Sequence, residues 1–209
     1  MLPFEDKMKQ GGAAAIQEVS RFFMKKDPVH ESLYKIAKRL RDSGIPHTIV
    51  GGLAVVVHGY ARTTVDIDVL VTPEGLKKAH EHLSGLGYVP IFEGSRNLRD
   101  TETSVRIEFV VTGEFPGDGK PKPVAFPHPS NCATEIDGIR YLRLEKLIDL
   151  KLASGMTNPG RLKDLADAQE LIRGLKLSSD FALRLDPYVR ERFKELWAAV
   201  QLDQSEPGK

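Results

Sequence analysis

Cysteine is almost absent from this sequence. Cys132 is the only one among 209 residues, which excludes an internal disulfide and argues against a thiolate metal centre. Long apolar runs are absent too, since none approaches the roughly 18 residues of a membrane span. The first residues also lack the basic and then apolar segments of a secretory signal. We therefore expect a cytoplasmic protein with no membrane partner.

An excess of charge of either sign is also missing. The chain has 30 Lys and Arg residues against 29 Asp and Glu residues, for a formal net charge of +1. This balance excludes a global electrostatic footprint for nucleic acid or an anionic membrane surface, although a local basic face stays open. With 41% hydrophobic and 28% charged residues, the composition is ordinary for a globular protein. The length allows one large domain or two small ones.

Short strand-like runs alternate with helical patterns along the chain. Apolar residues three and four apart predict helices, and short β-rich or alternating apolar runs predict strands. We expect helices at 13–26, 28–43, 53–58, 73–86, 144–154, 161–174 and 187–200, and strands at 47–50, 65–71, 88–92, 97–100, 105–111, 134–136 and 139–142. The Gly- and Pro-rich stretch 112–129 predicts a long surface loop. The sequence thus predicts an α+β fold, in which a mixed β-sheet flanked by helices precedes a C-terminal helical segment.

Two aspartates lie on one face of an apolar strand. In V-D-I-D-V-L-V, Asp66 and Asp68 are two residues apart, and side chains alternate between the faces of a strand. Both carboxylates therefore point the same way, where like charges repel and are costly to bury unpaired. A Mg²⁺ ion resolves that conflict, because it prefers oxygen ligands and commonly takes one or two carboxylates with substrate phosphates. The alternative is a strand whose carboxylates only face water.

Paired glycines stand between the preceding strand and helix. Gly51 and Gly52 lack a Cβ atom, so backbone N–H groups at this turn can approach a phosphate beside the start of a helix. By itself such a turn is also compatible with an ordinary tight connection. Its combination with the two aspartates that follow is more specific than either feature alone.

A third carboxylate is available in V-R-I-E-F-V-V. Glu108 shares a strand face with Arg106, and three acids converge if this strand neighbours that of Asp66 and Asp68. Three acids suit a two-metal transfer, in which one ion carries the triphosphate and the other activates the attacking hydroxyl. Glu108 is equally compatible with an exposed strand residue paired with Arg106.

These motifs resemble the DNA polymerase beta-type nucleotidyltransferase superfamily, and most closely its AbiEii-type members, which include toxins of toxin–antitoxin pairs. The residues that carry the resemblance are Gly51, Gly52, Ala54, His58, Gly59, Arg62, Thr64, Asp66 and Asp68, with Lys146, Lys151, Arg161, Lys163, Asp164 and Asp167 in the helical segment. The resemblance covers residues 45–172. It implies a catalytic domain over 1–143, which includes the N-terminal helices, and a helical segment over 144–209 packed on it.

The resemblance also implies roles for individual residues. Asp66, Asp68 and Glu108 would be the catalytic, metal-binding acids for Mg²⁺ or Mn²⁺, although Glu108 stands where the superfamily commonly has Asp. The nucleotide-binding residues would be Gly51, Gly52, Arg62, Thr64, Lys151 and Asp164. Simpler interpretations stay open: a surface salt bridge for Arg62, and a salt-bridge ladder within one helix for Arg161, Asp164 and Asp167. Of the two helix lysines, we favour Lys151 over Lys146, because Lys151 interrupts an apolar run.

The predicted function is transfer of a nucleoside monophosphate from an NTP to an acceptor hydroxyl, with release of pyrophosphate. The acceptor stays open between RNA, especially tRNA, a small molecule and a protein. An RNA acceptor would need a local basic face, for which the candidates are Arg96, Arg99, Arg106, Lys120 and Lys122. The toxin resemblance adds an antitoxin protein as a partner. The alternative function is a catalytically silent protein that keeps the fold and binds a nucleotide or a partner.

Overall fold

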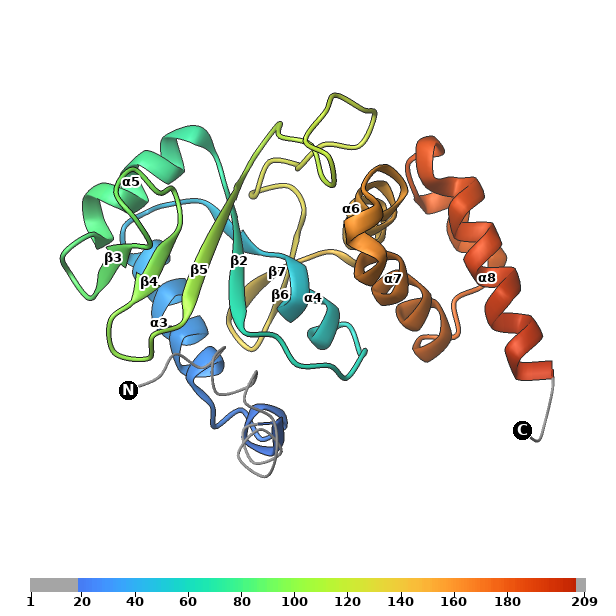
Figure 1. The fold of residues 1–209 in the computed structure, drawn as a ribbon, viewed down its shortest axis with the longest axis horizontal. Helices are drawn as coiled ribbons and strands as arrows, with labels where there is room; N and C mark the ends of the chain where they lie inside the picture. Colours follow the sequence, from blue (N-terminus) through green and yellow to red (C-terminus); the bar gives the residue numbers. More distant parts are fainter. Residues whose placement is uncertain (1–18, 206–209) are drawn as a thin grey trace.

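The computed structural model describes residues 19–205, in which a β-sheet with its own helices stands beside a group of C-terminal helices (Figure 1). The helices are α3 (Pro28–Asp42), α4 (Gly51–Val57), α5 (Pro73–Leu83), α6 (Leu144–Thr157), α7 (Leu162–Gly174) and α8 (Arg190–Ser205). Short 3-10 helices lie at η1 (Pro159–Arg161), η2 (Ser179–Arg184) and η3 (Pro187–Val189). The helix expected at 13–26 lies partly outside the described residues, and its part at 19–23 is helical.

Seven strands form one mixed sheet in the order β3-β4-β5-β2-β1-β7-β6. Their bounds are β1 (His47–Ile49), β2 (Asp66–Val71), β3 (Tyr88–Pro90), β4 (Leu98–Asp100), β5 (Arg106–Val111), β6 (Ala133–Ile136) and β7 (Ile139–Leu142). Strand β2 runs parallel to β5 and antiparallel to β1, and β1 runs parallel to β7. The sheet and its helices confirm the expected α+β class.

The two faces of β2 belong to different layers. Ile67, Val69 and Val71 are buried in a core shared with α3 and α5. Leu70 points the other way, into a second core built mainly by the C-terminal helices and their connections. Because side chains alternate along a strand, Asp66 and Asp68 lie on the face of Leu70. The acidic face of β2 therefore looks toward the C-terminal helices.

Local chemistry explains several of the element boundaries. Asp27 caps α3 by accepting from the backbone N–H of Val29 at 2.8 Å, and Thr72 caps α5 by accepting from Gly75 at 3.0 Å. The turn of the β6–β7 hairpin uses Asp137 and Gly138, whose φ angles of 52° and 74° suit a two-residue turn. The expected hairpin and the expected long loop before it both form.

One boundary differs in an informative way. Helix α4 begins at Gly51, two residues before the expected start at residue 53. Gly51 has a φ of +60°, so the chain turns from β1 into α4 within the glycine pair itself. This sharp turn places the start of α4 directly against β2, since the backbone N–H of Val50 donates to the carbonyl of Asp68 at 3.0 Å. Within residues 19–205, no helix has the length and apolar character needed to cross a membrane.

Candidate functional site

Strands β2 and β5 bring three carboxylates together. The two strands pair in parallel, with Asp68 opposite Glu108 and Asp66 opposite Arg106. Facing residues on paired strands have side chains on the same side of the sheet. Asp66, Asp68 and Glu108 therefore share one patch on the face toward α6 and α7. From the sequence, the three acids converge only if the two strands are neighbours, and the two strands are neighbours in the sheet.

Arg106 lies within this acidic patch. One of its guanidinium nitrogens is 3.0 Å from Oε1 of Glu108 and 3.5 Å from Oδ2 of Asp66. On its other side Asp66 accepts a hydrogen bond from the hydroxyl of Thr64 at 2.9 Å. Thr64 precedes β2 and is buried. Asp66 is therefore bound by Thr64 from its own segment and by Arg106 from the neighbouring strand.

Asp68 is the acid whose ionisation is most disfavoured. Burial, together with the neighbouring charges of Asp66 and Glu108, raises its pKa to about 7, although Lys151 and a hydrogen bond from the backbone N–H of Gly52 act in the opposite direction. The Gly52 amide, which the sequence offered as a phosphate contact, thus binds Asp68 in this structure. A cation placed beside Asp68 would favour its ionised form.

We expect Asp68→Asn to stabilise the folded protein above neutral pH. An acid whose pKa is higher when folded than when unfolded costs stability as pH rises from its unfolded value, about 3.9, to its folded value. For Asp68 the folded value is about 7, so the cost grows through this window and is complete above it. Its upper limit is about 4 kcal/mol, because one pKa unit corresponds to about 1.4 kcal/mol.

Urea unfolding at pH 5, 6.5 and 8 measures this effect. The advantage of Asp68→Asn over the wild type should grow along the series, and added Mg²⁺ should stabilise only the wild type at pH 8. If the gain in stability does not change with pH, the raised pKa of Asp68 is contradicted.

The glycine pair leaves no room for side chains. A Cβ atom on Gly51 would lie 1.8 Å from Oδ2 of Asp68, and one on Gly52 would lie 2.7 Å from the hydroxyl of Thr64 and 2.9 Å from a guanidinium nitrogen of Arg62. The glycines therefore allow α4 to approach the acidic face of β2 closely. Their role in this structure is to leave space for the side chains of Asp68 and its neighbours.

A buried network of ion pairs lies across from the acidic patch. Lys151 of α6 lies 2.6 Å from Oδ1 of Asp164 and 2.8 Å from Oδ2 of Asp167, both on α7. Arg62, from the connection before β2, is 2.9 Å from Oδ1 of Asp167. Ser154 donates to the second oxygen of Asp164 at 2.6 Å. The network ties the connection that leads into β2 to the two helices that face the carboxylates.

This pairing differs from the ladder considered for α7. Asp164 and Asp167 reach a lysine on α6 and an arginine before β2, because both face inward, where Asp167 is 1% exposed. Arg161 is exposed instead. Lys151 is the inward lysine, as favoured from the apolar run, and Lys146 pairs with Asp149 at 2.9 Å. The signal in the sequence was a pair of acids on one helix face together with one lysine in an apolar run.

Removing Asp167 should therefore destabilise the protein strongly. Asp167→Ala leaves Arg62 without this carboxylate and Lys151 with one acid in place of two, and breaking a buried ion pair on one side costs about 3–5 kcal/mol. The matched control is Glu170→Ala on the same helix, because the Glu170–Arg173 pair is partly exposed and such pairs contribute about 0–1 kcal/mol. Denaturant midpoints compare the two. Equal losses would show that the network around Asp167 has no special role.

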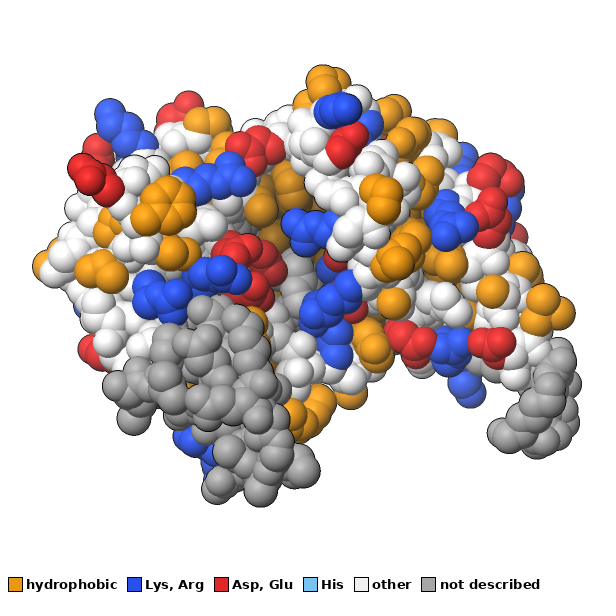
Figure 2. Space-filling view, in the orientation of Figure 1, with side chains coloured by type: hydrophobic (Ala, Val, Ile, Leu, Met, Phe, Trp, Pro, Cys, Tyr) orange, Lys and Arg blue, Asp and Glu red, His pale blue; other side chains and the backbone are white. Residues whose placement is uncertain are grey.

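A cavity of about 320 Å³ joins the acidic patch to the ion network. Figure 2 shows acidic and basic side chains near each other at the hollow between the two halves of the molecule. The cavity is lined by Gly51, Gly52, Arg62, Thr64, Asp66, Asp68, Glu108, Lys151 and Asp164, and also by Arg96, Asn97, Pro116, Gly117, Ser154, Arg161 and Lys163 among others. All nine site residues selected from the sequence thus line one cavity.

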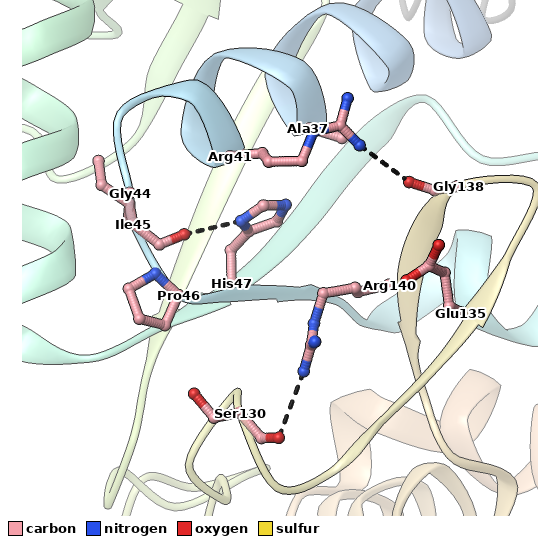
Figure 3. Close-up of a pocket in the computed structure, with 10 residues that line it drawn as sticks. All are labelled: Ala37, Arg41, Gly44, Ile45, Pro46, His47, Ser130, Glu135, Gly138 and Arg140. Carbon is pink, nitrogen blue, oxygen red and sulfur yellow. Dashed lines mark hydrogen bonds between the residues drawn. The ribbon is translucent and has the colours of Figure 1, made fainter.

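A second cavity of about 320 Å³ lies between the end of α3 and the β6–β7 hairpin. Figure 3 shows that its two guanidinium groups point apart: Arg41 donates to the carbonyl of Gly138 and Arg140 to that of Ser130, at 3.2 and 3.3 Å. His47 between them donates toward the carbonyl of Ile45, and burial lowers the pKa of its imidazole. These groups do not converge on one point, so this cavity lacks the chemistry of the first.

The acidic patch suits a divalent cation by its donors. Three carboxylates offer only oxygen ligands, which hard cations such as Mg²⁺ prefer, and their mutual repulsion raises the pKa of Asp68. Among residues 19–205, however, no three His, Cys, Asp or Glu side chains already stand together as a set of metal ligands. The donors fit the ion, and two of them, Asp66 and Glu108, are paired with Arg106.

The basic face considered for RNA is largely paired internally. Arg96 binds Glu114 at 2.7 Å, and Arg106 binds Asp66 and Glu108 as described. Lys122 binds Asp118 at 2.6 Å, with its side chain only 5% exposed. Lys120 is exposed. Arg99 donates to the carbonyl of Ser104 at 2.7 Å. Arg96, Arg106 and Lys122 are thus each paired with at least one carboxylate of the chain.

Comparison with known proteins identifies the fold. No family model and no curated protein sequence matches the chain. The solution structure of the antibiotic-resistance factor ANT(2'')-Ia is similar, with a TM-score of 0.50, 15% identity, and coverage of 82% of this chain and 94% of that one. Its crystal structure in complex with adenylyl-2''-tobramycin has a TM-score of 0.45 and 13% identity, with coverage of 81% of this chain and 97% of that one. The crystal structure of JHP933 from Helicobacter pylori has a TM-score of 0.45 and 17% identity, with coverage of 84% of this chain and 90% of that one. The chain therefore has the fold of ANT(2'')-Ia.

Proposed function

We propose that this protein is a metal-dependent nucleotidyltransferase that moves a nucleoside monophosphate from an NTP to an acceptor hydroxyl. The observation that carries the proposal is the convergence of Asp66, Asp68 and Glu108 on one wall of a cavity. Lys151, Arg62 and Arg161 line the other side of the same cavity. A cavity with three acids on one wall and the cations of an ion network on the other suits a metal-bound triphosphate, because transfer chemistry relies mainly on positioning and charge stabilisation.

The residues of the chain divide this work. Asp66, Asp68 and Glu108 would hold Mg²⁺ or Mn²⁺, which when bound neutralises the triphosphate and lowers the pKa of the acceptor hydroxyl. Thr64 orients Asp66 through its 2.9 Å hydrogen bond. Lys151 offers its ammonium group from α6, and Asp164 fixes that group at 2.6 Å.

Residues around these groups complete the site. Gly51 and Gly52 keep α4 close to the acids without adding side-chain bulk. Arg62 lines the cavity while it binds Asp167, so its guanidinium is held in place before any ligand arrives. Residues 144–209 serve in this proposal as the helical segment that closes the site over the catalytic domain of 1–143.

The reaction is tested with purified protein, each of the four α-labelled NTPs, and Mg²⁺ or Mn²⁺. Parallel incubations contain total tRNA, a mixture of aminoglycosides, or no added acceptor, and pyrophosphate release is measured in each. Label in tRNA would identify an RNA acceptor, label in an aminoglycoside a small molecule, and label in the protein alone a protein hydroxyl. Absence of both pyrophosphate and label in all incubations would contradict the proposal.

We further propose, from the AbiEii-type motifs, that the activity arrests growth as the toxin of a toxin–antitoxin pair. Arg62, Thr64, Asp66 and Asp68 carry this resemblance in the segment before and within β2. Inducible expression of the chain in a bacterial host should stop growth, and Asp66→Ala should restore it at equal protein level. Growth that continues with the wild-type protein would contradict the toxin proposal and leave the enzymatic one to the assay above.

A catalytically silent protein is the second candidate, and Arg106 is the observation that favours it. A guanidinium group already binds Asp66 and Glu108, and the third acid is Glu where related enzymes commonly have Asp. Calorimetry with an NTP and Mg²⁺, run beside the pyrophosphate assay, separates the candidates. Binding without turnover by the wild type supports the silent protein.

A further inference from the structure

Arg106 bridges two of the three acids, Asp66 and Glu108. It stands on β5 two residues before Glu108 and directly opposite Asp66. Its guanidinium group reaches both of these acids, at 3.0 Å from Glu108 and 3.5 Å from Asp66. Its side chain is 33% exposed. A monovalent cation of the chain itself therefore binds two of the three acids that the proposed function assigns to a divalent one.

The guanidinium group of Arg106 is not fully hydrogen-bonded. Its Nε atom is buried with no hydrogen-bond partner among the described residues. An unsatisfied buried donor is costly to stability. Attraction to Asp66 and Glu108 offsets that cost, because without Arg106 three carboxylates would repel one another across the strand pair. The guanidinium group thus depends on the two acids to stay in place.

We propose that Arg106 is an internal counter-ion that competes with the divalent cation for Asp66 and Glu108, and that cation binding displaces it toward the cavity. The inference rests on the proposed function, because it concerns the same acids. It explains why the described residues hold no ready set of three ligands: Asp66 and Glu108 are engaged by Arg106. It also makes the affinity for the metal a quantity that this arginine lowers.

The experiment is direct Mn²⁺ binding, followed by electron paramagnetic resonance at pH 8 without nucleotide. Arg106→Gln removes the charge but keeps a polar side chain, and Mn²⁺ binding should become at least about tenfold tighter, since unit charges a few ångströms apart interact strongly near a protein surface. Arg106→Lys keeps the charge and should gain less. The matched control is Arg99→Gln, because Arg99 lies opposite Arg106 on β4 and donates to the carbonyl of Ser104 at 2.7 Å.

A second readout needs no substitution. In the wild type, the Nε–H proton of Arg106 should exchange slowly with water in the absence of metal. It should exchange rapidly after Mg²⁺ is added, because the Nε atom would leave its buried position. Slow exchange in both states would overturn the proposal. This measurement also decides the matter if Arg106→Gln fails to fold.

The counter-ion role of Arg106 and the proposed function are contradicted by different outcomes. If the wild type does not bind Mn²⁺, or if Asp68→Asn binds it equally well, the proposed metal site and the proposed function are both wrong. If Mn²⁺ binding depends on Asp68 but Arg106→Gln binds no more tightly than Arg99→Gln, only the counter-ion role is wrong. Weaker binding by Arg106→Gln would show that Arg106 positions the acids for the metal.

Discussion

Asp68→Asn should abolish nucleotidyl transfer, with a fall of at least about 10²–10³-fold in turnover, while the fold stays intact. Loss of one preorganised charge-stabilising group commonly costs this much, and Asp68 lies at the centre of the patch, with Asp66 beside it and Glu108 opposite. Asn can still accept the hydrogen bond from the Gly52 amide, so the turn before α4 is retained. Asp66→Asn should have a similar effect.

The measurement is pyrophosphate release and label transfer at saturating NTP, with circular dichroism to verify the fold. Glu135→Gln is the matched control, because Glu135 is an exposed strand carboxylate on β6 away from the acidic patch. It should keep full activity. Turnover within a few-fold of the wild type in Asp68→Asn would rule out the metal role of this acid. A variant that is more stable at pH 8 yet inactive would combine both effects expected of Asp68.

Gly51→Ala should remove activity and stability together. The added Cβ would lie 1.8 Å from Oδ2 of Asp68, so Asp68 must rotate away from the patch or α4 must move. Displacement of a catalytic group by about 1 Å can cost about 100-fold in rate. The φ of +60° adds about 1–2 kcal/mol of backbone strain for any residue with a Cβ. The loss of stability should therefore exceed the strain alone.

Gly44→Ala separates the two contributions. Gly44 has a φ of +66°, close to that of Gly51, but a Cβ there would have no atom within 4 Å. Its substitution should show only the backbone strain and keep full activity. Thermal unfolding and NTP turnover of both variants complete the comparison. Equal destabilisation of the two, with activity retained in Gly51→Ala, would mean that the close approach of α4 to Asp68 is not required.

These experiments test a site whose two walls come from distant parts of the chain. Strands β2 and β5 supply the acids, and α6 and α7 supply Lys151 and Asp164. Arg62 binds Asp167 at 2.9 Å and so joins the segment before β2 to α7. Because this contact is buried, relative movement of the two walls would require breaking an ion pair. The cavity is therefore held together by charge as well as by the apolar core behind it.

Local sequence was sufficient for much of the site. The alternation of side chains along a strand put Asp66 and Asp68 on one face without reference to any other residue. The same rule placed Arg106 and Glu108 on one face of their strand. Lys151 was selected over Lys146 because a charge within an apolar run must face a partner when the helix packs. Each of these inferences depends on a few neighbouring residues, for which backbone geometry is decisive.

Other features could be decided only by the tertiary structure. The chain alone left open whether β5 lies beside β2, and the observed register places Glu108 opposite Asp68, which is 40 positions earlier in the chain. It also left open that Arg106 would bind Asp66, that the Gly52 amide would bind Asp68, and that Asp167 would bind Arg62.

The physical reason is the range of the interactions. Periodicity and turn chemistry act over a few residues, and so the sequence by itself determined which strands and helices form and which faces carry charge. Ion pairs form between whichever charged groups packing brings within about 4 Å, and that distance depends on how β2, β5, α6 and α7 meet. The sequence predicted nine of the residues that line this cavity, and the fold decided which of them bind one another.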